Sequence, residues 1–385
     1  MKIAMLGHKR IPSREGGVEV VVTELATRMA ALGHDVVVYN RDGRSQAPSS
    51  SGASETEGAR EYRRVQIETV RTVDVKGLAA ASSSYFAMKA AIEGKPDVIH
   101  VHAEGPAAMC GMARRAGIPC VVTVHGLDWQ RAKWGLLGRR YILHGEKAAV
   151  KSADGMIVLS RNLKEYFQGK YNRATRFIPN GIEAKAKAEP NIICDKYGLA
   201  GGDYVLYVGR MVPEKGVHYL IEAYLGLRER GLCRGKKLVL AGGPSDSQEY
   251  YDRLKAMAAG SDIVFTGFAE GGELAELYSN AYLYVLPSDL EGMPMSLLEG
   301  MAYGNCCVVS DIPENTSVIG DCGATFKRGS VSSLASCLEG LLEDEDRVAG
   351  FASRSADHVL SAYNWDRVCE DTLSLYEECI SERGC

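Results

Sequence analysis

The chain has 385 residues, of which 46% are apolar and 24% are charged, and its formal net charge is -4. This length exceeds what one hydrophobic core usually supports, so we expect two domains. The balanced charge argues against a nucleic-acid-binding protein. The eleven cysteines include no CxxC pair, which favours reduced thiols over a disulfide framework or a zinc site.

Membrane-directed segments are not expected. The apolar run at the N-terminus is too short for a signal peptide, and no stretch approaches the roughly 20 apolar residues that span a bilayer. The composition therefore predicts a cytoplasmic protein, with the inner face of the membrane as the alternative location.

Short apolar runs alternate with longer helical patterns in the first half, which is typical of a parallel sheet with crossover helices. The expected strands span residues 2–6, 35–39, 97–102, 120–125, 155–159 and 176–179. The expected helices span residues 18–32, 83–92, 135–151 and 162–166. A Ser-, Gly- and Ala-rich stretch over residues 42–59 is expected to form a loop beside this sheet.

The second half repeats the arrangement after a polar boundary segment over residues 183–203. Its expected strands span residues 204–208, 237–241, 263–266, 282–286 and 306–309. Its expected helices span residues 216–229, 248–259, 273–279 and 294–303, and an amphipathic helix over 364–380 ends the chain. The pattern predicts an α/β protein of two Rossmann-like domains.

The richest candidate site is the stretch SDLEGMPMSLLEGMAYG over residues 288–304. Pro294 is expected in the first turn of a helix, where unpaired backbone N–H groups attract phosphate. Those N–H groups belong to Gly292, Met293, Met295 and Ser296. Glu291 would then reach a sugar hydroxyl, and Glu299, eight positions later, a ribose diol. The alternative is a capped helix whose glutamates are solvated.

Two further loops are candidate anion sites. Arg210 and Lys215, in VGRMVPEKG after an expected strand, could clamp a diphosphate, or they are solvated surface cations. Gly16 and Gly17 allow close backbone approach before an expected helix, or they form a plain turn. The spacing is not GxGxxG and the next strand ends without an acid, so an NAD site is not expected.

Histidines mark the remaining candidate. His125 follows an expected strand and precedes a glycine, a placement that favours function, although a lone histidine is more often structural. His100, His102 and Glu104 would share one strand face. We favour strand and loop positions over zinc there because no separate fourth ligand is evident.

The order of these motifs along the chain resembles that of a known protein family. With HGLDW and IPNG (residues 178–181), they make the chain resemble the retaining GT-B glycosyltransferases of family 4 over nearly its whole length. The opening GHKRIPSREGGVE is similar to that of a bacterial subgroup of rhamnosyl- or capsule-type transferases. The resemblance implies two Rossmann-like domains facing across a cleft. Residues 1–183 would form the acceptor side, with a C-terminal helix over about 363–385 packing back on it, and residues 200–362 would bind the donor.

The resemblance also implies roles for individual residues. His125, Arg210, Lys215 and Glu291 would be catalytic, and the two cations would stabilise the leaving nucleotide. The implied donor-binding residues are Gly16, Gly17, Arg210, Lys215, Gly267, Phe268, Glu291, Gly292, Met293, Pro294, Met295, Ser296 and Glu299. Trp365 and Tyr376 would lie on the C-terminal helix. Glu183 and the sequence over residues 305–307 depart from the family pattern and weaken the subgroup assignment rather than the class.

No Asp-x-Asp motif follows a suitable strand, so we expect a nucleotide-diphosphate sugar to be used with neither metal nor cofactor. The acceptor would be a saccharide or a polyprenyl-linked saccharide, with Asp128 and Trp129 as its contacts. The basic amphipathic stretch over residues 128–147 predicts peripheral membrane contact or an ordinary helix with a solvated face. A nucleotide-sugar epimerase of the same twin-domain fold and a non-catalytic nucleotide-sugar-binding protein are the alternative functions.

Overall fold

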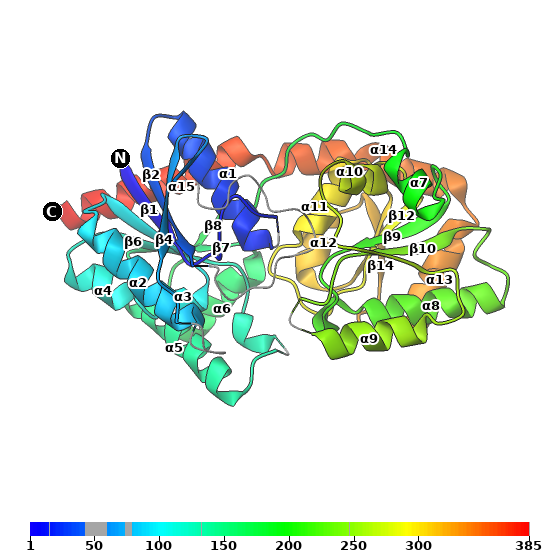
Figure 1. Cartoon of the computed structure of the whole chain (residues 1–385), viewed down its shortest axis with the longest axis horizontal. Helices are drawn as coiled ribbons and strands as arrows, with labels where there is room; N and C mark the ends of the chain where they lie inside the picture. The colour runs from blue at the N-terminus through cyan, green and yellow to red at the C-terminus, as the bar shows by residue number, and fades with distance from the viewer. Residues whose placement is uncertain (15, 43–59, 74–78, 132, 246, 385) are drawn as a thin grey trace. The chain divides into compact units, whose positions relative to one another are not determined.

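The computed structural model describes residues 1–14, 16–42, 60–73, 79–131, 133–245 and 247–384. The chain divides into two compact units (Figure 1). Unit 1 comprises Met1–Gly181 and Trp365–Cys385, and unit 2 comprises Ile182–Asn364. The loop expected over 42–59 lies, beyond Asp42, outside the described residues.

Unit 1 is built on an eight-stranded sheet with the order β3-β4-β2-β1-β5-β6-β7-β8. All its neighbouring strands are parallel except the pair β3 and β4. β1 lies between β2 and β5, so the strand order reverses at β1. The strands are β1 Lys2–Leu6, β2 Asp35–Arg41, β3 Glu61–Tyr62, β4 Val65–Val70, β5 Val98–His102, β6 Cys120–Val124, β7 Gly155–Val158 and β8 Arg176–Phe177.

Helices cover both faces of this sheet. α2 to α5 lie on one side, and α1 and the C-terminal α15 lie on the other (Figure 1). A Cβ added to Gly181 would lie 2.5 Å from the Trp365 ring, so this glycine allows the start of α15 to pack closely. The helices are α1 Gly17–Ala31, α2 Ala79–Glu93, α3 Glu104–Ala107, α4 Cys110–Arg115, the 3₁₀ turn η1 Asp128–Gln130, α5 Leu136–Ser152, α6 Arg161–Tyr171 and α15 Trp365–Gly384.

Unit 2 has a six-stranded parallel sheet with the order β11-β10-β9-β12-β13-β14. α8, α9 and α13 lie on one side of it, and α10, α11 and α14 on the other (Figure 1). The strands are β9 Tyr204–Val208, β10 Lys237–Ala241, β11 Val264–Gly267, β12 Leu283–Leu286, β13 Cys307–Ser310 and β14 Gly323–Phe326. The helices are α7 Ile192–Tyr197, η2 Pro213–Lys215, α8 Val217–Glu229, α9 Gln248–Met257, α10 Gly271–Ser279, α11 Met295–Ala302, α12 Pro313–Ile319, α13 Val331–Leu342 and α14 Glu345–Ala362.

Every strand expected from the sequence is present within a few residues of its expected bounds. β3, β4, β14, α3, α4, α7, α12, α13 and α14 were not expected. α7 lies inside the polar segment expected as a boundary, because Ile193 is fully buried in the core of unit 2 and gives this short helix an apolar contact. Among the described residues, no helix combines the length and the apolar character that crossing a bilayer requires.

Candidate functional site

The candidate donor site of unit 2 lies where its strand order reverses. β9 has β10 on one side and β12 on the other, and open α/β sheets bind ligands beyond the carboxyl ends of the strands at such a point. Arg210 and Lys215 follow β9, and Glu291 follows β12. Parallel pairing of β9 with β12 therefore brings together two sequence motifs that are far apart along the chain.

Glycines let the loops at this edge approach one another. Gly216 has a φ of +65°, and a Cβ there would lie 2.1 Å from the Pro287 carbonyl oxygen. Gly242, after β10, has a φ of +142°, and its Cβ would lie 1.8 Å from the Gly209 carbonyl oxygen. The Met211 N–H donates to the Gly243 carbonyl at 2.8 Å. These contacts fix the path of the loop that carries Arg210 and Lys215.

Lys215 and Glu291 form an ion pair, with the ammonium nitrogen 2.5 Å from a carboxylate oxygen. Their side chains are only 15% and 7% exposed, so the surrounding protein shields the pair from solvent. The Ser288 hydroxyl donates to the same Glu291 oxygen at 2.6 Å. The Ser288 carbonyl in turn accepts a hydrogen bond from the Ser310 hydroxyl. Lys215 and Glu291 thus form one charged centre.

Arg210 differs from Lys215 in its bonding. Its guanidinium has no ion pair or side-chain hydrogen bond to any residue that the structure describes, and the residue is half-buried. Its carbonyl accepts a hydrogen bond from the buried Tyr207 hydroxyl at 2.9 Å. The backbone of Arg210 is therefore held in place, while its cation is available for an anionic ligand.

The stretch over residues 288–304 forms a loop followed by α11. The sequence predicts Pro294 inside the first turn of the helix. In the structure Pro294 is instead the residue that precedes the helix. Its ψ of 90° is non-helical, and its carbonyl accepts from the N–H groups of Leu297 and Leu298. The expected donor contacts are distributed around this start: Glu291, Gly292 and Met293 in the loop, and Met295, Ser296 and Glu299 in α11.

The segment expected to hold the base, Gly267 and Phe268, lies at the end of β11, which pairs with β10 on the side away from β9. Gly267 ends β11, and its carbonyl accepts from the Gly242 N–H at 2.7 Å. Phe268 follows and is 49% exposed. A large exposed aromatic side chain beyond the carboxyl end of β11, the edge strand next to β10, offers a surface on which a planar base can stack.

In unit 1, Gly16 precedes α1 and Gly17 is its first residue, as the glycine pair predicts. A Cβ on Gly16 would lie 2.5 Å from a Glu19 carboxylate oxygen. The other oxygen of Glu19 accepts from the Lys9 N–H at 3.0 Å. The start of α1 therefore already has a carboxylate close to it, which any donor phosphate would have to avoid.

His125 belongs to a row of buried histidines that crosses from β5 to β6. Its Nε2 lies 3.1 Å from Nδ1 of His102. His100 contacts the Thr123 hydroxyl at 2.7 Å and the Tyr376 hydroxyl of α15 at 2.6 Å. Burial lowers the pKa of His125 to about 4 and that of His100 to about 3, so both rings are neutral at physiological pH.

Glu104 does not share the strand face of His100 and His102, contrary to the prediction. β5 ends at His102, and Glu104 starts α3 after Ala103, whose φ is +76°. Within the described ranges, no group of three or more His, Cys, Asp or Glu side chains is arranged to hold a metal ion.

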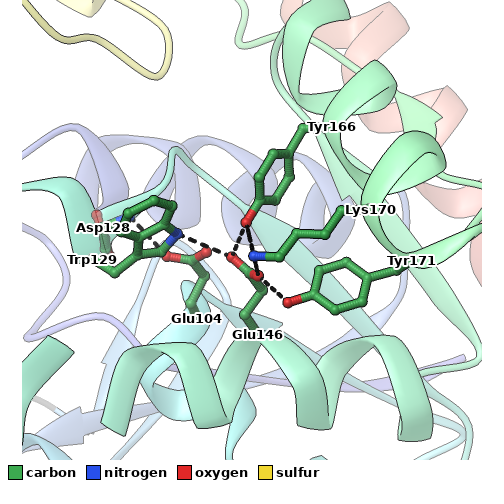
Figure 2. A network of polar contacts seen from close by, with 7 residues as sticks. All are labelled: Glu104, Asp128, Trp129, Glu146, Tyr166, Lys170 and Tyr171. Carbon is green, nitrogen blue, oxygen red and sulfur yellow. Dashed lines mark hydrogen bonds and ion pairs between the residues drawn. The ribbon is translucent and has the colours of Figure 1, made fainter. Parts of the chain in front are cut away.

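Asp128 and Trp129, the expected acceptor contacts, lie in η1 and are tied to two buried glutamates (Figure 2). The Asp128 N–H donates to Glu104 at 2.7 Å, and the Trp129 indole donates to Glu146 at 3.2 Å. Glu146 also accepts from Lys170 at 2.9 Å and from the hydroxyls of Tyr166 and Tyr171. Glu104, Asp128 and Trp129 were each named from the sequence for other reasons, but no local pattern predicted this network, because its members come from α3, η1, α5 and α6.

Two family models match the two halves of the chain. Glycosyltransferase Family 4 matches residues 15–186, and Glycosyl transferases group 1 matches residues 195–357. The chain belongs to the glycosyltransferases. A glycogen synthase of Mycobacterium tuberculosis is 28% identical to this glycosyltransferase, over 98% of this chain and 94% of its own length.

Solved structures show that the glycosyltransferase has the GT-B fold. A sucrose-phosphate synthase from Thermosynechococcus elongatus superposes with a TM-score of 0.81 at 21% identity, covering 99% of both chains. Anabaena HepE in complex with UDP-glucose superposes with a TM-score of 0.78 at 18% identity, covering 97% of this chain and 99% of that one.

Proposed function

We propose that this glycosyltransferase moves a sugar from a nucleotide-diphosphate sugar to a saccharide or lipid-linked saccharide. The observation that carries the proposal is the charged centre of Lys215 and Glu291 in unit 2, which lies, like Arg210, after the strands at the strand-order reversal. Cations in this position neutralise the charge that develops on a departing nucleotide, and a carboxylate can bind sugar hydroxyls. The UDP-glucose bound by the HepE structure supports a donor of this class.

We propose that the leaving group is stabilised by Arg210, Lys215 and the amides at the start of α11, without a metal ion or cofactor. Fixed cations and amide dipoles supply electrostatic stabilisation without reorganising during the reaction. The transfer would retain the anomeric configuration: the acceptor hydroxyl attacks the face that the nucleotide leaves, and its proton passes to the departing phosphate. His125 would contribute as a neutral hydrogen-bonding group close to the sugar.

Synthesis of a surface polysaccharide, at the inner face of the membrane, is the setting that we propose. The likeness of the opening motif to rhamnosyl- and capsule-type transferases supports it, and so does the start of α5. There Leu136 and Leu137 are 68% and 80% exposed, beside the exposed Arg139 and Arg140. Apolar side chains next to cations suit an anionic lipid surface. Co-sedimentation with neutral and anionic liposomes, for the wild type and R139E/R140E, tests this part.

The donor is tested by thermal shift with UDP-, GDP-, dTDP- and ADP-sugars, because a bound ligand raises stability with the logarithm of its concentration. Turnover of the stabilising donor is then measured with saccharide acceptors, with EDTA and with added Mg²⁺ or Mn²⁺. Activity that requires the metal would refute the metal-free clamp, and failure of every nucleotide sugar to bind would refute the donor class. The family models favour transfer over epimerisation; isomerisation of the donor without an acceptor would reverse that preference.

A further inference from the structure

The network around Glu146 contains more carboxyl groups than cations to pair with them. Lys170 pairs with Glu146 at 2.9 Å, and Arg131 pairs with Asp128 at 2.9 Å. Glu104 is fully buried and has no ion-pair partner among the residues that the structure describes. An isolated buried carboxylate is strongly disfavoured, and the group binds a proton instead.

Packing forces Glu104 against its acidic neighbours. Gly145 of α5 lies so close to α3 that a Cβ there would be 1.9 Å from the Glu104 carbonyl oxygen. Figure 2 shows the carboxyl group of Glu104 beside that of Glu146 and below η1. Burial, the charge of Asp128 and contact with Glu146 together raise the pKa of Glu104. Burial also raises the pKa of Glu146, but hydrogen bonds from Tyr171, Lys170 and Tyr166, together with the neighbouring Glu104, lower it by more.

η1 is thereby anchored at two points. Glu104 accepts from the Asp128 N–H, and Glu146 accepts from the Trp129 indole. The Asp128 N–H also donates to the Gly126 carbonyl at 3.0 Å, which joins η1 to the residue directly after His125. The Asp128 carboxylate acts electrostatically on His125 and raises its pKa against the larger effect of burial. The two glutamates therefore control how the segment from His125 to Trp129 is held.

We propose that Glu104 is a neutral carboxylic acid and a positioning residue, which together with ionised Glu146 holds the His125–Trp129 segment in its working orientation. This inference rests on the proposed function, because His125 is assigned there to the transfer reaction. The acid would accept the Asp128 N–H with its carbonyl oxygen and direct its proton toward Glu146. The charged and titratable groups that surround it are Asp128 and Arg131 near η1, Tyr141 and Glu146 on α5, and Tyr166, Lys170 and Tyr171 on α6.

The test compares E104Q, E104A and the control E93A, an exposed glutamate of α2, in the full chain. Glutamine mimics a neutral acid, so E104Q should keep kcat within about twofold. E104A should lower kcat about 10- to 100-fold, with the donor KM unchanged, because the segment loses an anchor. E93A should match the wild type. Equal losses in E104Q and E104A, or wild-type kcat in E104A, would overturn the proposal.

Two readouts do not depend on turnover. The infrared band of a protonated carboxylic acid should be present in the wild type at neutral pH and absent from E104Q. The NMR signals of the His125 ring should move in E104A and stay in place in E104Q. If the wild type transferred no sugar, the proposed function would fail. These spectra would still show whether Glu104 is protonated and whether it orients the His125–Trp129 segment.

Discussion

The ammonium of Lys215 lies 2.5 Å from the carboxylate of Glu291, although 76 residues separate them along the chain. An ammonium has three protons, and this pair uses one of them. Lys215 is therefore oriented by Glu291 and still has protons to donate to a phosphate. Loss of either residue leaves the other without its partner of opposite charge, so the two residues should be studied together.

Arg210→Ala should reduce kcat about 100- to 1,000-fold, which is typical for removal of a fixed group that stabilises charge in the transition state. Its Tm should stay near that of the wild type, because the guanidinium has no polar side-chain partner among the described residues. Steady-state kinetics and a thermal melt check both parts. R230A, at a surface ion pair with Glu339, is the matched control and should leave kcat unchanged. A wild-type rate in R210A would contradict the clamp.

Lys215→Met should destabilise the protein by about 1–3 kcal/mol, because it leaves the largely buried Glu291 without its cation. Glu291→Gln should remove much of that cost, so the double variant should be less destabilised than the two single variants added together. Urea unfolding of the four proteins measures this coupling, with an expected size of about 0.5–3 kcal/mol. Strict additivity would show that the pair has no energetic connection.

Gly216→Ala should destabilise unit 2 by at least about 1–3 kcal/mol, because the residue has a φ of +65° and its Cβ would overlap the Pro287 carbonyl oxygen. Donor affinity should fall with it, since the loop of Lys215 would shift. Gly226→Ala, in the middle of α8 with no atom within 4 Å of its Cβ, is the control. It should stabilise by roughly 0.5–1 kcal/mol. Calorimetry measures the change in stability of each variant, and donor titration measures the change in donor affinity.

Glu104→Gln should flatten the dependence of stability on pH. The pKa of Glu104 is raised to about 10 in the folded protein, mainly by burial, from an ordinary value of 4.5. The unfolded chain therefore loses this proton first as the pH rises. Stability from this group is fully present below about pH 4.5 and is lost progressively up to about pH 10, by at most about 1.4 kcal/mol per pH unit. Urea unfolding from pH 5 to 9 should show that the free energy of unfolding of E104Q rises relative to that of the wild type as the pH increases. Parallel curves of stability against pH would contradict a protonated Glu104.

His125 should give no limb in the pH profile of kcat near pH 6.5, the ordinary pKa of histidine. Burial lowers its pKa to about 4, so the ring stays neutral as the pH falls from 8 to about 5. H125A should lower kcat throughout this range, because a neutral hydrogen-bonding group is lost. A pH–rate profile of both proteins checks this, and a limb near pH 6.5 that H125A abolishes would show that the charged ring participates.

The sequence predicted most of the sheet strands and most long helices, because alternation of apolar runs with helical periodicity is a local property of the chain. It also predicted where α1 begins, from the glycine pair Gly16 and Gly17. It missed β3, β4 and β14, and it missed the longer helices α13 and α14. It also missed the short helices α3, α4, α7 and α12, whose apolar positions are too few to show a period. The sequence predicted that the helix begins at Pro294, one residue before its actual start at Met295. A proline suits the position before a helix as well as its first turn.

Local pattern could not decide which side chains meet. Arg210, Lys215 and Glu291 were named separately as site candidates, and parallel pairing of β9 with β12 places them at one edge. Asp128 and Trp129 were named as acceptor contacts, and the structure ties them to Glu104 and Glu146. The sequence placed Glu104 on the strand face of His100 and His102, and it did not single out Glu146. Burial and charge pairing depend on contacts between residues far apart in the chain, and only the tertiary structure supplies those contacts.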